Sequence, residues 1–209
     1  MLPRTKLIVA GVVLLVAVFV LDQWRQRSSS EHEPAQEEKT VEVSEEWKEF
    51  QPTTGLFKVK LPALPQHASD AVPLPSGQGL IKYDMYLSQK KNGRTFMVSL
   101  IQYPELFDTS SPNELLDGVM KEMMAGNVNN KLKMVQKGEF RTYPAIDFEI
   151  QNNDVLLRSK TFLAGKTLFV LTLIDRSEKD LDSEFAKFSD SLLVNGMQPA
   201  ALPSNTVSK

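Results

Sequence analysis

An apolar run near the amino end constrains this chain more than any other feature. Fifteen uncharged, almost wholly apolar residues, Leu7–Leu21, follow directly behind Arg4 and Lys6. A helix of that length rises about 22 Å, somewhat less than the ~30 Å hydrocarbon core of a bilayer. Trp24 at the interface and snorkelling Arg side chains extend such a span at its end. The run therefore predicts either a short membrane anchor or the apolar region of a secretory signal.

The residues behind the run favour an anchor that is not cleaved. Signal peptidase needs small residues three and one positions before the cut, and Val16–Arg27 offers no such pair. Cleavage at Ser28–Ser30 would need an unusually long preceding segment that contains Trp and Arg. The sequence thus predicts a signal anchor over residues 1–24, with its span at 7–21. Two alternatives remain: secretion after cleavage, and a soluble cytosolic adaptor in which the run is a buried core helix.

The charges around the span predict its orientation. The α-amino group, Arg4 and Lys6 precede it, whereas Asp22, Arg25 and Arg27 follow it. This asymmetry is modest but favours a cytoplasmic amino end. We therefore expect a single-pass protein of a bacterial inner membrane whose C-terminal domain is periplasmic. The alternative location is outside the cell, after secretion.

The charge distribution divides the chain into segments that its net charge of −2 conceals. Residues 28–49 carry eight Glu against two Lys, whereas residues 50–209 carry 18 Lys+Arg against 17 Asp+Glu. Residues 25–45 contain almost no aliphatic side chains, which predicts a disordered acidic tether. The tail, 197–209, contains Pro and Ser and is expected to be flexible. The neutral folded part argues against nucleic acid as a partner, because binding to phosphates needs concentrated Lys and Arg.

Residues 46–196, between the tether and the tail, are predicted to form one domain that contains many strands. Short apolar-rich runs separated by turn residues predict eight strands: Trp47–Gln51, Leu56–Leu61, Leu80–Ser88, Thr95–Tyr103, Leu132–Phe140, Ala145–Gln151, Val155–Leu163 and Thr167–Ile174. The stretch Leu168–Ile174 is apolar at almost every position, so it predicts a central strand covered on both faces. Gly93, Asn153 and Gly165 lie between consecutive strands and tolerate the positive φ of tight hairpins. The sheet is therefore expected to be largely antiparallel.

Two amphipathic windows predict helices. Ser111, Pro112 and Glu114 suit an N-cap, a first helical residue and a capping box, and Gly126 marks the end of this helix. The second window, residues 178–192, has an apolar face made by Leu181, Phe185, Phe188 and Leu192. The predicted fold is α+β: a largely antiparallel sheet of about six to eight strands with two main helices packed on it, an α/β/α sandwich, behind the N-terminal transmembrane helix.

Four phrases of the sequence carry a resemblance to a known family. They are GLFKVKLPALP at 55–65, YPAIDFEI at 143–150, FLAGKTLFVL at 162–171 and FAKFSDSL at 185–192. With the order of elements, they make residues 47–194 resemble the PsbP/Mog-type α/β/α sandwich superfamily, which includes bacterial PsbP-like domains of unassigned role. The resemblance implies scaffolding or partner binding, since plant PsbP supports the water-oxidising manganese cluster and Mog-type proteins bind the GTPase Ran. It assigns no residue of this chain to a partner surface.

The lack of Cys and the presence of only two His exclude several classes of catalytic and metal-binding site. The chain has no Cys, which excludes thiol catalysis, iron–sulfur clusters, Cys-ligated zinc and lipoprotein attachment. Its two His are His32, in the tether, and His67, which we interpret as a loop histidine in a Pro-rich segment. A Ser-His-Asp triad would have to use His67, and the sequence has no Gly-x-Ser-x-Gly elbow. We therefore assign no catalytic, cofactor-binding or metal-ligating residue and expect no cofactor.

Carboxylate chemistry is harder to exclude. Asp147 and Glu149 lie two residues apart on the polar face of one predicted strand, close enough to share a cation. Pairing with a base on the next strand, such as Lys160, is the favoured interpretation. A small basic face for an anionic partner is a second hypothesis for this region; its members are Lys137, Arg141, Arg158 and Lys160. The acids Asp175, Asp180 and Asp182 are expected to cap the second helix.

These observations predict a membrane-anchored extracytoplasmic module that acts by non-catalytic binding or assembly. Its expected partners are the membrane, through the N-terminal helix, and a protein whose identity the sequence does not reveal. An envelope hydrolase that uses carboxylates on one sheet face is the alternative, and a secreted soluble binding protein is the second alternative. The lack of Cys and the presence of only two His weigh against an enzyme.

Overall fold

A computed structural model of the protein describes residues 46–74, 77, 79–176 and 179–195. Within those residues the chain forms ten strands and two helices. The strands are β1 (Lys48–Phe50), β2 (Phe57–Leu61), β3 (Gln66–Pro73), β4 (Leu80–Gln89), β5 (Thr95–Gln102), β6 (Asn130–Phe140), β7 (Tyr143–Asn152), β8 (Val155–Ala164), β9 (Thr167–Asp175) and β10 (Leu193–Val194). The helices are α2 (Pro112–Ala125) and α3 (Leu181–Asp190).

The main sheet has seven strands in the order β3-β4-β5-β9-β8-β7-β6, and every neighbouring pair is antiparallel. The predicted central strand is β9, which lies at the middle of this order, and all but its last residue are buried. The three predicted hairpin residues have positive φ, at 92° for Gly93, 53° for Asn153 and 59° for Gly165. The prediction of an α+β fold built on an antiparallel sheet is confirmed.

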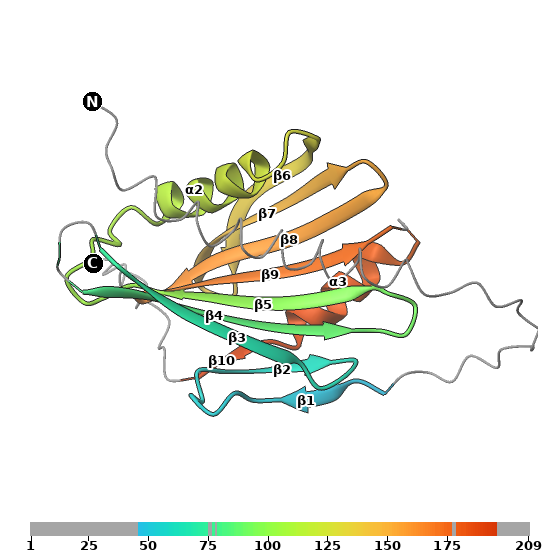
Figure 1. The fold of residues 1–209 in the computed structure, drawn as a ribbon, viewed down its shortest axis with the longest axis horizontal. Coiled ribbons are helices and arrows are strands. Elements are labelled where there is room, and N and C mark those ends of the chain that lie inside the picture. Colours follow the sequence, from blue (N-terminus) through green and yellow to red (C-terminus); the bar gives the residue numbers. More distant parts are fainter. Residues whose placement is uncertain (1–45, 75–76, 78, 177–178, 196–209) are drawn as a thin grey trace, which may run out of the picture.

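The main sheet is covered on both faces (Figure 1). Helix α2 contacts β6, β7 and β8 on one face, whereas α3 contacts β8 and β9. A small sheet of order β1-β2-β10 packs with α3, because Phe57 of β2 and Phe188 of α3 belong to the same buried cluster. The described residues therefore form three layers: α2, the main sheet, and α3 with the small sheet.

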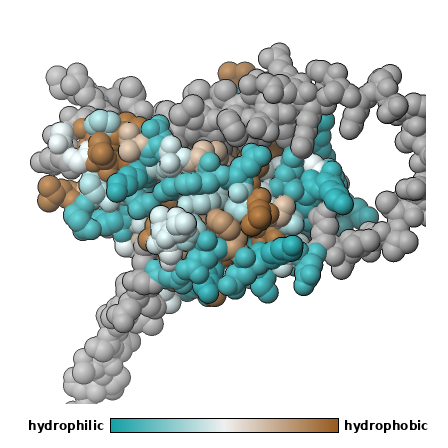
Figure 2. Space-filling model, turned by 60° about the horizontal axis from the view of Figure 1, so that its bottom comes forward, coloured by the Kyte–Doolittle hydropathy of each residue, from teal (hydrophilic) through white to brown (hydrophobic). Residues whose placement is uncertain are grey.

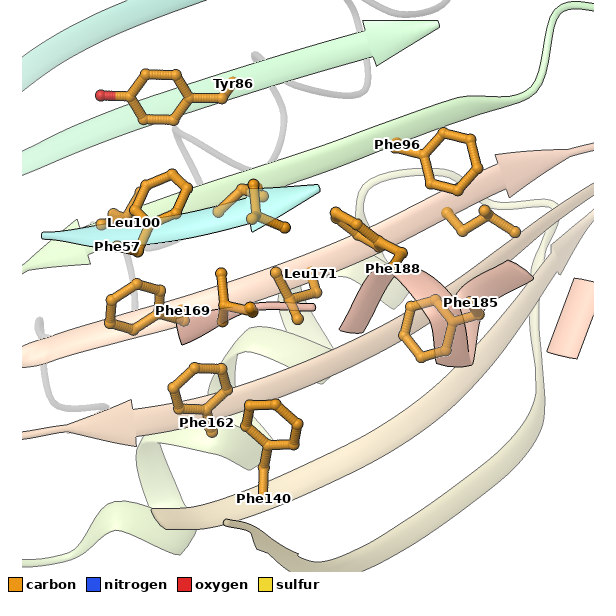
Figure 3. Close-up of a cluster of buried hydrophobic side chains, with 14 of the residues drawn as sticks. Phe57, Tyr86, Phe96, Leu100, Phe140, Phe162, Phe169, Leu171, Phe185 and Phe188 are labelled. Atoms are coloured by element: carbon orange, nitrogen blue, oxygen red, sulfur yellow. The ribbon is translucent and has the colours of Figure 1, made fainter. Parts of the chain in front are cut away.

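Aromatic side chains fill the core between the main sheet and the layer of α3 (Figure 3). Phe169 of β9 stacks on Phe162 of β8 with ring centroids 4.9 Å apart and planes 1° from parallel. Phe57 of the small sheet meets Phe169 edge to face at 6.3 Å. All three side chains are fully buried. This cluster joins the two sheets, because each sheet contributes rings to it.

A second core lies under α2. Leu116 and Val119 of α2 are buried against Ile146 and Phe148 of β7. The methionines of α2 pack beside them as half-buried side chains; these are Met120, Met123 and Met124. The apolar spacing of the predicted helix thus marks the face that packs on the sheet.

Three local predictions are wrong or incomplete. His67 is not in a loop: it lies in β3, an edge strand that the sequence analysis did not predict because almost all of its residues are exposed. Ser111 precedes α2 as predicted but makes no side-chain cap hydrogen bond, so the capping box does not form. The second helix begins at Leu181 rather than 178, after Asp180, which has φ 58° and makes no side-chain cap hydrogen bond either.

The predicted membrane segment falls outside the described residues. Within the part of the chain that the structure describes, neither helix is long and apolar enough to cross a bilayer. The predicted anchor at 1–24, the tether at 25–45 and the tail at 197–209 all remain predictions from sequence.

Candidate functional site

The predicted carboxylates form a charge ladder with bases on the neighbouring strand. Asp147 lies opposite Lys160 in the β7–β8 register, and Glu149 lies opposite Arg158. The Lys160 Nζ is 3.2 Å from Asp147 Oδ1, and the Arg158 Nη1 is 3.8 Å from Glu149 Oε2. The favoured interpretation, cross-strand pairing, is confirmed. We call these four residues the β7–β8 charge ladder.

Aromatic rings of the α3-side core border this ladder. The Lys160 Nζ lies 5.1 Å from the ring centroid of Phe140, and the Arg158 guanidinium lies 5.8 Å from that of Phe185 on α3. Side-chain exposure of the four charged residues is between 18% and 26%. The ladder is thus partly desolvated, and it connects the β7–β8 half of the sheet to α3.

The four predicted basic residues do not form one basic face. Lys137 lies opposite Ile146, on the α2 side of the sheet, where its Nζ is 2.8 Å from Asp117 of α2. Arg141 sits in the β6–β7 turn and donates hydrogen bonds to the carbonyl oxygen of Leu192 at 2.8 Å and of Asp190 at 3.2 Å. It therefore caps the end of α3. The hypothesis of a joint surface for an anionic partner is wrong.

His67 takes part in a polar group on the β3–β4 edge. Its Nε2 lies 2.8 Å from Asp84 Oδ1, and its ring stacks on that of Tyr86 at 4.4 Å. Gln102 donates to the other oxygen of Asp84 at 3.1 Å. Burial raises the pKa of Tyr86 above its ordinary value, Asp84 adds to that rise, and a hydrogen bond with Thr54 opposes it. The His67 side chain is 46% exposed, so this group lies at the surface.

The most buried charge network among the described residues was not predicted from the sequence. Arg94, which follows the β4–β5 turn, is 6% exposed and is hydrogen-bonded to Asp175 through Nε, at 2.6 Å, and through Nη2. Its Nη1 is 2.9 Å from Glu184 Oε2 on α3, and its Nη2 also donates to the Lys179 carbonyl at 2.7 Å. Lys90 completes the network with its Nζ 2.6 Å from Glu184 Oε1. Asp175 therefore binds Arg94 instead of capping the helix.

The surroundings of this network perturb Glu184. Burial alone would raise its pKa, but the hydrogen bonds and charges of Lys90 and Arg94 outweigh burial and hold the pKa below its usual range. Trp47 lies alongside, edge to face with Phe96 at 4.9 Å, and the Lys187 Nζ lies 4.6 Å from a Trp47 ring centroid. The network thus fixes the β4–β5 hairpin and the start of the domain to α3. No local sequence pattern signals it, because its partners lie more than 80 positions apart.

The polar groups described here do not gather into a metal centre. Among the described residues, no group of three or more His, Asp or Glu side chains is placed to hold a metal ion. Figure 2 turns the small sheet toward the viewer, and on that side most of the coloured surface is hydrophilic, with apolar residues in small separate patches. Lys58 and Glu49, which pair across β1 and β2 at 3.4 Å, contribute to the charge of the small sheet.

Comparison with known proteins leaves the family open. No family model matches the chain, and no curated protein is similar to it. Among solved structures, the chain is similar to cyanobacterial PsbP (CyanoP) from Synechocystis sp. PCC 6803, with 13% sequence identity and a TM-score of 0.46. The similarity covers 78% of this chain and 99% of that one. At these values the likeness does not establish a family, so membership of the PsbP/Mog-type superfamily stays a prediction from the sequence phrases.

Proposed function

We propose that this protein is a membrane-anchored module that acts outside the cytoplasm by non-catalytic binding or assembly. The anchor rests on the apolar run Leu7–Leu21, and the orientation rests on the basic residues in front of it. The folded domain supplies a rigid surface, because its sheet is buried on both faces and joined to a second sheet by aromatic packing.

One observation carries the binding half of this proposal: the carboxylates that an envelope hydrolase would use are engaged in structural pairs. Asp147 and Glu149 each face a base across the β7–β8 ladder. A general acid, base or nucleophile must be within reach of substrate and free to exchange its proton or bond. Carboxylates held by cross-strand bases instead stabilise the sheet, which supports a scaffold rather than a catalyst.

The anchor and the location are tested by fractionation and a reporter fusion. We expect the full chain to stay in membranes after carbonate washing, and alkaline phosphatase fused after Lys209 to be active. A matched variant, Leu14→Arg with Val16→Arg, places two charges at the middle of the run, at a cost of about 2.5–3.5 kcal/mol each for insertion. This variant should lose both properties. Release of the wild-type chain as a shorter soluble protein would contradict the anchor and support secretion.

A further inference from the structure

The outermost strand of the main sheet has an edge that pairs with no other described strand. β6 ends the strand order and, among the described strands, pairs with β7 alone. Its register with β7 is regular over the seven residues Met134–Phe140 and shifts between Leu132 and Met134. The outward N–H and C=O groups of an edge strand are a template for another strand. Residues Met134–Phe140 therefore present regular backbone to an incoming segment.

Side chains along this edge form a row of defined chemistry. Val135, Lys137 and Glu139 alternate along β6, and the register places Val135 and Lys137 opposite Phe148 and Ile146 on the α2 side. Val135 is 46% exposed, although most apolar side chains of the main sheet are buried. Glu139 is exposed at one end of the row, whereas Lys133, which is also exposed, lies at the bulge and outside the regular pairing. From Val135 to Glu139 the row is apolar, basic and acidic.

This row restricts what can pair with it. Lysines and a bulge on an edge strand oppose pairing with unselected strands. A strand that does pair must offer an apolar residue opposite Val135 and a base opposite Glu139, since opposite charges across a strand pair stabilise it and like charges destabilise it.

The chain contains such a segment next to its own domain. Residues 39–45 read KTVEVSE and place Lys39, Val41, Val43 and Glu45 on one side of an alternating pattern. We propose that this segment of a second copy adds to β6 as an antiparallel strand. The matching register places Lys39 opposite Glu139, Val41 opposite Lys137 and Val43 opposite Val135. This inference rests on the proposed function and names the partner of the module as another copy of the chain.

The donor segment must come from another copy because it does not reach β6 within one chain. Trp47 packs on Phe96 of β5, which fixes the start of the domain over that strand. A strand added outside β6 lies five strand spacings from β5, about 24 Å. The four residue-to-residue steps from Val43 to Trp47 span at most about 14 Å. Each copy therefore gives its segment to a neighbour and receives one at β6.

Such an exchange is head to tail, because the donated segment and the receiving edge are different surfaces. Heterologous contacts of this kind close into rings or extend into rows. Copies anchored in one membrane share a plane, which raises their effective concentration and favours the exchange without a large interface. The remainder of the tether would act as the spacer between anchor and row.

Disulfide trapping between two populations tests this contact directly. The chain has no Cys, so full-length Val43→Cys and full-length Val135→Cys proteins can be mixed in the same vesicles, and any V43C–V135C bond joins two copies. The control is Leu106→Cys, a residue that is 76% exposed and lies in the loop before α2. We expect the V43C–V135C product to exceed the V43C–L106C product about tenfold. Glu139→Lys in the receiving copy should lower the yield about three- to tenfold, and Lys39→Glu in the donor copy should restore it.

Equal yields with Val135→Cys and Leu106→Cys would overturn the inference. Failure of Lys39→Glu to rescue Glu139→Lys would overturn the register. A disulfide or photo-crosslink from position 135 to an unrelated protein, in place of a second copy, would also overturn the inference. It would still agree with the proposed binding function. Carbonate extraction of the wild-type chain tests the proposed function separately, because it does not depend on the yield of trapped copies.

Discussion

Removal of Arg94 is expected to destabilise the domain more than removal of any exposed base. Arg94 is 6% exposed, and it supplies hydrogen bonds or ion pairs to Asp175, Glu184 and the Lys179 carbonyl. Arg94→Met keeps most of the side-chain volume but leaves Asp175, whose side chain is 14% exposed, without its charge partner. Breaking a buried pair by removing one partner costs about 3–5 kcal/mol. That loss is a large part of the 5–15 kcal/mol that usually stabilises a domain.

Urea unfolding of the full chain in detergent micelles measures this loss. The chain has two Trp, so a Trp24→Phe background leaves Trp47, which lies beside the network, as the only Trp reporter. With an m-value of about 2 kcal/mol/M, Arg94→Met should lower the urea midpoint by about 1.5–2.5 M. The control is Arg176→Met, because Arg176 is 60% exposed and its pair with 67%-exposed Asp154 spans 3.5 Å. It should cost no more than about 1 kcal/mol.

A second substitution separates charge from packing. Arg94→Met with Asp175→Asn removes the unpaired carboxylate, so it should recover at least about 1 kcal/mol relative to Arg94→Met alone. A loss below about 1 kcal/mol for Arg94→Met, equal to that of Arg176→Met, would refute the assignment of this network as a structural centre of the domain.

Three further predictions test the packing, the turn and the acid response. Phe169→Ala should cost about 3–5 kcal/mol of unfolding free energy in the same assay, since Phe169 is fully buried between Phe57 and Phe162. The control is Leu106→Ala, at a residue that is 76% exposed, and it should change the unfolding free energy by less than about 0.5 kcal/mol. Gly79→Ala should lower the unfolding free energy by about 1–3 kcal/mol, because Gly79 has φ +119° and an added Cβ would lie 2.9 Å from Pro104 Cβ. The control is Gly118→Ala in α2, where an added Cβ would have nothing within 4 Å. This substitution should instead raise the unfolding free energy by about 0.5–1 kcal/mol. The depressed pKa of Glu184 means that its stabilising effect is present above the unfolded pKa of about 4.3 and is lost as pH falls through the folded pKa. Unfolding free energies of wild type and Glu184→Gln should therefore converge as pH falls from 6 toward 3, and a constant difference would contradict this.

The parts of the fold that were predictable from sequence are those whose burial leaves a local pattern. β9 is covered on both faces, so nearly every residue is apolar and the run Leu168–Ile174 stands out. α2 is covered on one face, so its apolar residues recur at helical spacing. The ladder pair Asp147–Lys160 was predictable because two adjacent strands joined by a tight turn have a fixed register.

The parts that were not predictable depend on contacts between distant segments. β3 lies at an edge with almost all of its residues exposed, so neither alternation nor an apolar run marks Gln66–Pro73. Arg94 and Asp175 are 81 positions apart, and nothing near either residue specifies the other. The same is true of Arg141, whose guanidinium caps α3 from the β6–β7 turn, 51 positions from Leu192. Tertiary packing alone decides these pairs.

In-cell crosslinking of the full-length chain, analysed by mass spectrometry, tests the central claim of a non-catalytic binding module most directly. The claim predicts reproducible crosslinks from the folded domain to a protein at the membrane, which under the strand-exchange inference includes a second copy. It also predicts that the double variant Asp147→Asn, Glu149→Gln keeps these crosslinks and loses no hydrolytic activity. A domain without reproducible crosslinks, together with a hydrolytic activity abolished by that pair of substitutions, would contradict the claim and establish the enzyme alternative.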